Sequence, residues 1–304
     1  MAKLRNDLSA EVSAVPARML VGRSATCFLR LSDAQVSGEH ALVQWTGQGW
    51  VLRDLGSRNG TYLNGRRLPV AASSPLGRGS QIAFGDPKVT FTMQDAGPPV
   101  PMALELRSRQ MRESQAGLLA LPNTDEPQAV VYQRDDGTWV QEAADETQGI
   151  ADQELVYLEQ QVWCVFLPDE AGVTPVVCAE KTLTATCFEF EVSRDEEHVV
   201  MTVVHGDERI ALEPREHHYV LLVLARARAK DAGLPQPERG WLSKDQLQQM
   251  LRIRPSALNV AVHRARQQLA DAGVVGAAGL VEVRRGLRRF GTDRFTERPL
   301  GTPA

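Results

Sequence analysis

Short apolar segments separated by tight-turn signals fill the chain from about residue 17 to residue 93, and this pattern constrains its fold most. Asn59-Gly60 and Asn64-Gly65 are turn dipeptides, because Asn and Gly both tolerate a positive φ angle. Many short strands at this spacing are typical of a β-sandwich. Strands are expected at 19–21, 28–31, 40–45, 50–54, 61–63, 81–84 and 90–92.

Proline and glycine divide the rest of the chain. The run Gly97-Pro98-Pro99-Val100-Pro101 interrupts both helix and strand formation, so a first domain is expected over residues 1–97. A second break at 121–127 makes 98–127 a linker, whose polar stretch at 107–115 suits an extended connection or an exposed helix.

Residues 128–193 form a β-rich segment to which the sequence assigns no role. They either extend the sheet of the following domain or make a small module of their own, and the C-terminal domain then spans 194–304. The strand-like segments lie at 129–133, 139–141, 154–158 and 161–167.

The composition indicates an ordinary soluble protein. The 304 residues are 43% hydrophobic and 24% charged, which suits two or three domains with packed cores. No apolar run approaches the roughly 20 residues that span a bilayer, and no signal-peptide core follows Met1. The four cysteines form no CxxC pair, so reduced thiols are expected. We therefore expect a cytoplasmic protein without membrane contact.

Charge is distributed unevenly along the chain. Residues 239–304 contain 12 Lys and Arg against five Asp and Glu, a net charge of +7, although the whole chain has a net charge of -4. The first 238 residues therefore have a net charge of -11. A basic end on an acidic protein suggests a surface for nucleic acid or another polyanion.

Four loop motifs in the first domain follow one another in an informative order. They are Gly22-Arg23-Ser24, Val36-Ser37-Gly38-Glu39-His40, the stretch from Asp54 to Thr61, and Asn64-Gly65. This succession resembles the forkhead-associated (FHA) domain over residues 12–95, which implies an eleven-stranded sandwich that binds phosphothreonine peptides. The chemistry fits, because a guanidinium and a hydroxyl suit a phosphate with about -1.5 to -2 charges and three acceptor oxygens.

The resemblance implies a role for each matching residue. Arg23 and Ser37 would hold the phosphate, Arg58 would contact the peptide, and Asn59 would bond the peptide backbone. Three further residues would shape the loops, with the histidine orienting rather than catalytic: Gly22, His40 and Gly60.

One position departs from the FHA pattern. Many family members have a basic or amide residue after the serine, and here it is Gly38. The sandwich therefore either binds phosphopeptides with one contact fewer or retains the loops without that affinity.

The C-terminal domain begins with alternating strands and continues with helices. Helices are expected from Glu213 to Asp231, over 243–251 with Ser243 as the N-cap, and over 255–272. A hairpin is expected at 280–290 around Arg284-Arg285-Gly286-Leu287.

This order makes a winged helix-turn-helix, so the fold class is multidomain, an all-β sandwich plus an α+β winged helix. Residues 194–292 resemble the output domain of OmpR/PhoB-type response regulators, although the family's Gly-Tyr ending is absent. The resemblance places the third helix in the major groove and the hairpin in the adjacent minor groove. The candidate DNA-binding residues are His263, Arg264, Arg266, Arg284 and Arg285.

Catalytic motifs are missing from the sequence. It has no GxxxxGK[ST] phosphate loop, no GxGxxG after a strand, no HExxH and no GxSxG elbow. His217-His218 lies near Glu213 and Glu216, but adjacent helical residues point about 100° apart, which does not suit a metal site. We expect no enzyme activity, no cofactor and no metal.

The function expected from these observations is phosphothreonine-dependent regulation of transcription. The FHA domain would dock on a protein phosphorylated by a Ser/Thr kinase, either a partner or a second copy in trans, and the winged helix would bind double-stranded DNA. The alternative is a signalling adaptor whose winged helix binds protein. A homodimer stays open, because such winged helices often act in pairs.

Overall fold

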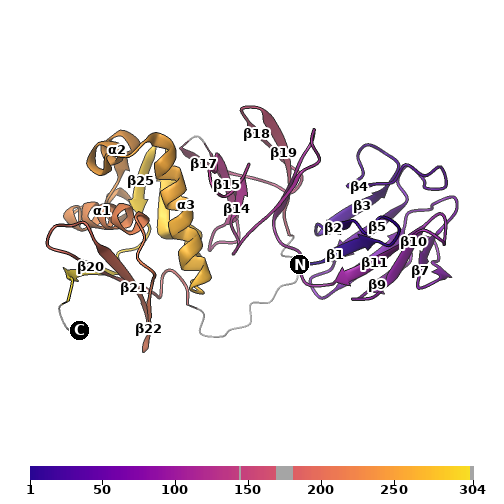
Figure 1. Cartoon of the computed structure of the whole chain (residues 1–304), viewed down its shortest axis with the longest axis horizontal. Helices are drawn as coiled ribbons and strands as arrows, with labels where there is room; N and C mark the ends of the chain where they lie inside the picture. Colours follow the sequence, from indigo (N-terminus) through magenta and orange to yellow (C-terminus); the bar gives the residue numbers. More distant parts are fainter. Residues whose placement is uncertain (144, 169–180, 302–304) are drawn as a thin grey trace. The chain divides into compact units, whose positions relative to one another are not determined.

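Strands dominate the structure, a computed structural model that describes residues 1–143, 145–168 and 181–301 (Figure 1). Contacts separate two units, one built on Met1–Met102 and the other on Ala103–Cys164 together with residues from 181 onward. Within the described residues, no helix is long and apolar enough to cross a membrane.

The first unit consists of a six-stranded and a five-stranded sheet, in the orders β2-β1-β11-β10-β7-β8 and β4-β3-β5-β6-β9. Alternate side chains of the two sheets share one core, which confirms the all-β expectation. The strands are β1 Lys3–Asn6, β2 Val12–Ala14, β3 Arg18–Gly22, β4 Leu29–Arg30, β5 Ala41–Trp45, β6 Trp50–Asp54, β7 Thr61–Leu63, β8 Arg66–Arg67, β9 Ser73–Leu76, β10 Gln81–Phe84 and β11 Thr90–Asp95.

The sequence pattern missed four strands of this sandwich. β1 and β2 contain few apolar residues, and β1 is held by its pairing with β11, about 90 residues further along the chain. β8 is two exposed arginines, and β9 contains Pro75 at an edge of its sheet, where proline is tolerated. Each of these strands depends on a partner strand rather than on a periodic apolar pattern of its own.

Residues 98–127 are structured, which corrects the prediction of a linker. They contain β12 Met102–Glu105, β13 Met111–Glu113 and β14 Leu119–Leu121. All the residues of β12 and β14 are buried, so these short apolar runs pair with strands further along the chain instead of lying in solvent. The prolines mark the ends of the strands, not a flexible connection.

Up to residue 166, the segment predicted as β-rich forms two four-stranded sheets with these strands, in the orders β13-β12-β19-β18 and β14-β15-β16-β17. Its last strand, Cys187–Val192, belongs to the sheet of the C-terminal part, so the predicted boundary between residues 193 and 194 is wrong. We call the second of these two sheets, β14–β17, the middle sheet. It is a module of its own rather than an extension of the following sheet. The remaining strands are β15 Ala129–Gln133, β16 Trp139–Ala143, β17 Glu146–Gly149, β18 Leu155–Leu158 and β19 Gln161–Phe166.

The C-terminal part opens with the sheet β22-β21-β20-β26. β20 and β21 bury alternate residues, as the sequence pattern predicts. β26 was not predicted: it returns from the end of the chain and pairs in parallel with β20, placing Phe188 opposite Phe295. The strands are β20 Cys187–Val192, β21 Val199–His205, β22 Glu208–Ala211 and β26 Phe295–Pro299.

Three helices and a hairpin complete this part. α1 is His217–Lys230 and so begins later than the predicted Glu213, whereas α2 Lys244–Leu251 has the expected cap, because Ser243 and Gln246 form a reciprocal capping box. α3 is Pro255–Asp271, and its Leu258, Val262, Ala265 and Leu269 lie in the core. A short sheet has the order β23-β25-β24, with β23 Leu242–Ser243, β24 Val281–Arg284 and β25 Leu287–Phe290. Two 3-10 helices cover Gln236–Glu238 and Ala277–Leu280.

Candidate functional site

The four residues predicted to bind a phosphopeptide meet around one loop, residues 35–38, which lies between β4 and β5 and beside the end of β3. The Arg23 Nε donates to the Val36 carbonyl at 2.8 Å. Ser37 Oγ accepts from the Arg58 backbone N–H at 3.1 Å, and the Asn59 side-chain amide donates to the Gln35 carbonyl at 2.8 Å. Three loops far apart in the sequence are thereby joined into one surface.

Two groups on this surface are available for an anion. Arg23 is exposed, and among the described residues no atom accepts a hydrogen bond from its two Nη groups. Ser37 Oγ uses a lone pair to accept from Arg58, so its O–H remains able to donate. A guanidinium edge beside a hydroxyl donor matches the acceptor oxygens of a phosphate.

His40 is a structural residue that stabilises the 35–38 loop from the interior of the domain. Its side chain is fully buried, its Nδ1 accepts from the Ser37 backbone N–H at 3.0 Å, and its Nε2 therefore donates to the Gly60 carbonyl at 3.1 Å. Burial lowers the pKa of His40, which favours the neutral ring that this pairing needs. The predicted orienting role fits this geometry.

The two predicted loop-shaping glycines are required for different reasons. A Cβ on Gly22 would lie 2.1 Å from the Gly38 carbonyl oxygen, so the two loops approach too closely for any side chain. Gly60 has a φ of +89°, a conformation that L-residues rarely adopt. Gly38 is unlike them, because a Cβ there would meet nothing within 4 Å.

Asp54 organises the loop that presents Arg58 and Asn59, and the sequence reading missed it. Its carboxylate accepts from the backbone N–H groups of Gly56 and Ser57 and from the hydroxyls of Ser57 and Thr61, the last at 2.6 Å. Burial alone would raise the pKa of Asp54, but these hydrogen bonds outweigh it and the pKa is lowered. Its position two residues before Gly56 was an available turn signal.

The five predicted DNA-binding residues divide into two groups. Arg264 on α3, with Arg284 and Arg285 at the turn of the hairpin, is exposed. His263 and Arg266 on α3 are only 3% and 1% exposed. Neither side chain reaches solvent in this fold, so neither could contact DNA unless the residues that cover it moved.

Arg266 is buried because the middle sheet supplies its partners. Its Nη2 donates to Glu142 Oε2 of β16 at 2.8 Å and also to the Val281 carbonyl. Its guanidinium lies over the Tyr132 ring of β15, 5.1 Å from the centroid. His263 lies in the same contact, and its burial, with the nearby Arg266 and Arg264 charges, lowers its pKa to about 4.

The histidine pair on α1 is a structural feature rather than a metal site. The Nε2 atoms of His217 and His218 both approach Gln268 Oε1, at 2.7 and 2.9 Å. Among the described residues, the cluster with metal-ligand spacing is instead the exposed group Asp195, Glu197 and His198 on the turn between β20 and β21.

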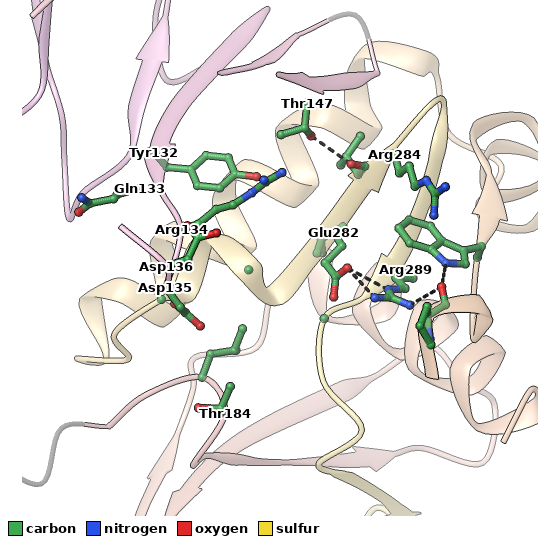
Figure 2. A pocket seen from close by; sticks show the side chains of 18 of the residues that line it. Tyr132, Gln133, Arg134, Asp135, Asp136, Thr147, Thr184, Glu282, Arg284 and Arg289 are labelled. Atoms are coloured by element: carbon green, nitrogen blue, oxygen red, sulfur yellow. Dashed lines mark hydrogen bonds and ion pairs between the residues drawn. The ribbon is translucent and has the colours of Figure 1, made fainter. Parts of the chain in front are cut away.

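A cleft of about 710 Å³ lies between the middle sheet and the β24–β25 hairpin, inside the second unit (Figure 2). Arg289 in its wall is already paired with Glu282 at 2.7 Å, and its guanidinium lies 4.5 Å from the centre of the Trp241 ring. Arg284 and Arg285 also line the cleft, but so do carboxylates of the middle sheet, namely Asp135, Asp136 and Glu146. The mixed charge selects no ligand class.

Comparison with known proteins places the first of these sites in a family. The model of the FHA domain matches residues 19–85. The FHA domain-containing protein FhaB of Mycobacterium tuberculosis is 39% identical over 59 residues, which are 19% of this chain and 38% of that protein. An FHA domain-containing protein of Arabidopsis thaliana is 38% identical over 58 residues, 19% of this chain and 15% of that protein. The chain thus matches well under half the length of either.

One solved structure, Mycobacterium tuberculosis EmbR in complex with a low-affinity phosphopeptide, is 29% identical, with a TM-score of 0.29. That match covers 32% of this chain and 24% of the EmbR chain. The family match, together with the motif residues gathered around the 35–38 loop, leads to one conclusion. Residues 19–85 of this chain form an FHA domain.

Proposed function

We propose that this protein is a non-enzymatic, cytoplasmic regulator that binds a threonine-phosphorylated protein through its FHA domain and double-stranded DNA through its C-terminal part. The observation that carries the first half is the surface formed by Arg23, Ser37, Arg58 and Asn59. Its free guanidinium edge and hydroxyl are the donors that a phosphate monoester requires, at roughly 1.5–3 kcal/mol for each charge-assisted hydrogen bond. The phosphate would be added by a Ser/Thr kinase, on a partner or on a second copy.

The second half rests on the order of elements and on charge. A sheet, three helices and a hairpin follow one another as in a winged helix-turn-helix, with α3 in the position of the recognition helix. Arg264, Arg284 and Arg285 are exposed on α3 and on the hairpin turn. Cations at these two places would neutralise phosphates on both sides of a groove and release counterions.

A second candidate function is a signalling adaptor whose C-terminal part binds protein. It is favoured by the burial of His263 and Arg266, since part of α3 already contacts another module of the chain. An adaptor would use such a helix for protein contacts and would show no affinity for DNA.

Two titrations of the full chain test the proposal. Fluorescence anisotropy with a phosphothreonine peptide library, beside the unphosphorylated and phosphoserine versions, tests the FHA half. Binding that does not depend on the phosphate would contradict it. Titration of labelled duplex DNA at several salt concentrations tests the other half, with binding expected to weaken steeply as salt rises. No binding even at low salt would favour the adaptor.

A further inference from the structure

The turn between β16 and β17 contacts α2 and the hairpin through one residue. The Asp145 carboxylate pairs with Lys244, the first residue of α2, at 2.7 Å, and with Arg288 of β25. Its backbone carbonyl accepts from the Gly286 N–H at 2.8 Å, at the tip of the hairpin. This single acidic residue therefore bridges two elements of the C-terminal part.

A second carboxylate, from strand β16, reaches α3. Glu142 pairs with Arg266 at 2.8 Å, and Arg288 also donates to Asn259 of α3 at 2.8 Å. Thr147 of β17 donates to the Val283 carbonyl of the hairpin at 3.0 Å, as Figure 2 shows. Glu142 and Asp145, at the end of the middle sheet where β16 turns into β17, thus pair with cations of α3 and of the hairpin.

The buried polar side chains near Glu142 and Asp145 have few hydrogen-bond partners. Among the described residues, the buried side-chain atoms without a hydrogen-bond partner include His263 Nδ1, Arg266 Nε, and Nε and Nη1 of Arg288. A buried donor without a partner destabilises the packing that buries it. Two guanidiniums gathered here with spare donors suit an anion with more acceptor oxygens than the carboxylates supply.

Among the described residues, the contact also has little apolar support. In the apolar cluster where the middle sheet meets the C-terminal part, Leu118 precedes β14, Val130 and Tyr132 lie on β15, and Val140 lies on β16. They meet one alanine, Ala278, from the other side. An interface held mainly by ion pairs weakens when one partner is replaced, and it opens more readily than an apolar one.

We propose that the middle sheet is an internal competitor for DNA. The Glu142 and Asp145 carboxylates occupy the positions that DNA backbone phosphates would take between α3 and the hairpin. Tight DNA binding therefore requires this end of the middle sheet to move away. Displacement would expose Arg266 and Arg288 beside the already exposed Arg264, Arg284 and Arg285, enlarging the cationic surface. The proposal rests on the DNA-binding half of the proposed function and describes its regulation.

The test compares variants of the full chain on a labelled 30-base-pair duplex of random sequence. E142Q/D145N removes both competing charges and is expected to tighten binding at least tenfold. The matched control is E113Q/E159Q, which makes the same charge change at two exposed positions outside the middle sheet. The control is expected to tighten binding less than threefold, which separates displacement from general electrostatics.

A third variant opens the contact without changing any residue of the three ion pairs. Ala278→Glu places a charge in the small apolar cluster and adds a negative charge to the C-terminal part. The added charge alone would weaken DNA binding, so a gain in affinity can come only from release of the middle sheet. Far-UV circular dichroism of all variants verifies that they remain folded.

The outcomes separate the two claims. Tighter binding by both E142Q/D145N and Ala278→Glu, but not by the control, supports the internal competitor. A parent chain that binds as tightly as both opened variants overturns it and leaves DNA binding standing. Absence of binding by every chain at low salt overturns the DNA-binding function, and the competitor with it.

Discussion

Arginines serve opposite purposes at the two candidate sites of this molecule. In the FHA domain, Arg23 is exposed and is positioned by one hydrogen bond to a loop 13 residues away. In the C-terminal part, Arg266 and Arg288 are buried against carboxylates that lie 124 and 143 residues away in the sequence. The first arrangement leaves a cation ready for a ligand, and the second neutralises cations before a ligand arrives.

The difference shows how far the exposure of each site's residues can be predicted from the local sequence. A loop motif that is closed by local hydrogen bonds determines its own exposure, so its residues can be recognised in the sequence. A helix face is exposed or covered according to what packs on it, and the middle sheet covers part of α3 from a distant segment. Substitutions can therefore be chosen to break one site while leaving the other intact.

The largest effect is expected at the phosphate-binding arginine. Arg23→Ala removes two charge-assisted hydrogen bonds, about 3–4 kcal/mol, so phosphothreonine-peptide affinity should fall at least 100-fold in anisotropy titrations. The matched control is Arg18→Ala at the exposed start of β3, which should bind as the parent does. DNA binding should be the same in all three chains. An Arg23→Ala chain that keeps its phosphopeptide affinity would refute the assignment.

Buried histidines should make the second unit sensitive to acid. Burial lowers the pKa of His217 and of His263 to about 4, below the ordinary 6.5. The unfolded chain therefore binds more protons between these values, and stability that is complete above pH 6.5 declines as the pH falls to about 4. The loss approaches roughly 3 kcal/mol for each histidine.

Urea unfolding followed between pH 7 and pH 4 measures this decline. His263→Asn and His217→Asn should each flatten the pH dependence of the unfolding free energy, because each removes a group that titrates only after unfolding. His198→Asn changes an exposed histidine and serves as the control. An unchanged pH profile in the first two variants would contradict the expectation.

A smaller effect is expected for the exposed cations of the C-terminal part. Arg264→Ala and Arg285→Ala should each weaken duplex binding several-fold and lower the slope of log affinity against log salt by about 1, as loss of one phosphate contact requires. Phosphopeptide affinity should not change. Equal salt slopes in parent and variants would show that these side chains do not face phosphates.

The smallest effect concerns the position where the loop departs from its family. A Cβ at position 38 would meet no atom within 4 Å, so Gly38→Asn can add one hydrogen bond to the peptide, worth about 1 kcal/mol or a fivefold gain in affinity. Gly22→Ala is the contrasting variant, since its Cβ would collide with the Gly38 carbonyl oxygen. It should lower both affinity and stability. Weaker binding by Gly38→Asn would indicate that the peptide backbone passes too close for a side chain.

Much of the fold could be read from periodicity. The alternation in β5, β6, β20 and β21 and the capped helix α2 are local patterns, and the structure has them at or near the expected bounds. Two of the strands that were missed, β1 and β26, are short and are stabilised by partners distant in the sequence. These two strands contain too few apolar residues for a periodic signal. The prolines between residues 97 and 127 led to the prediction of a linker where the structure has strands.

The sequence alone determined the FHA loops, because Arg23, Ser37, Asn59 and their glycines act through bonds to neighbouring loops of one small sandwich. It also determined the helices and the hairpin of the C-terminal part, because the spacing of apolar residues within each of these segments predicts its buried face. Only the tertiary structure decided which cations of α3 and the hairpin meet solvent. That depends on the packing of Glu142 and Asp145, because burial of a charge is set by whatever covers it and pairs with it, not by the segment that bears it.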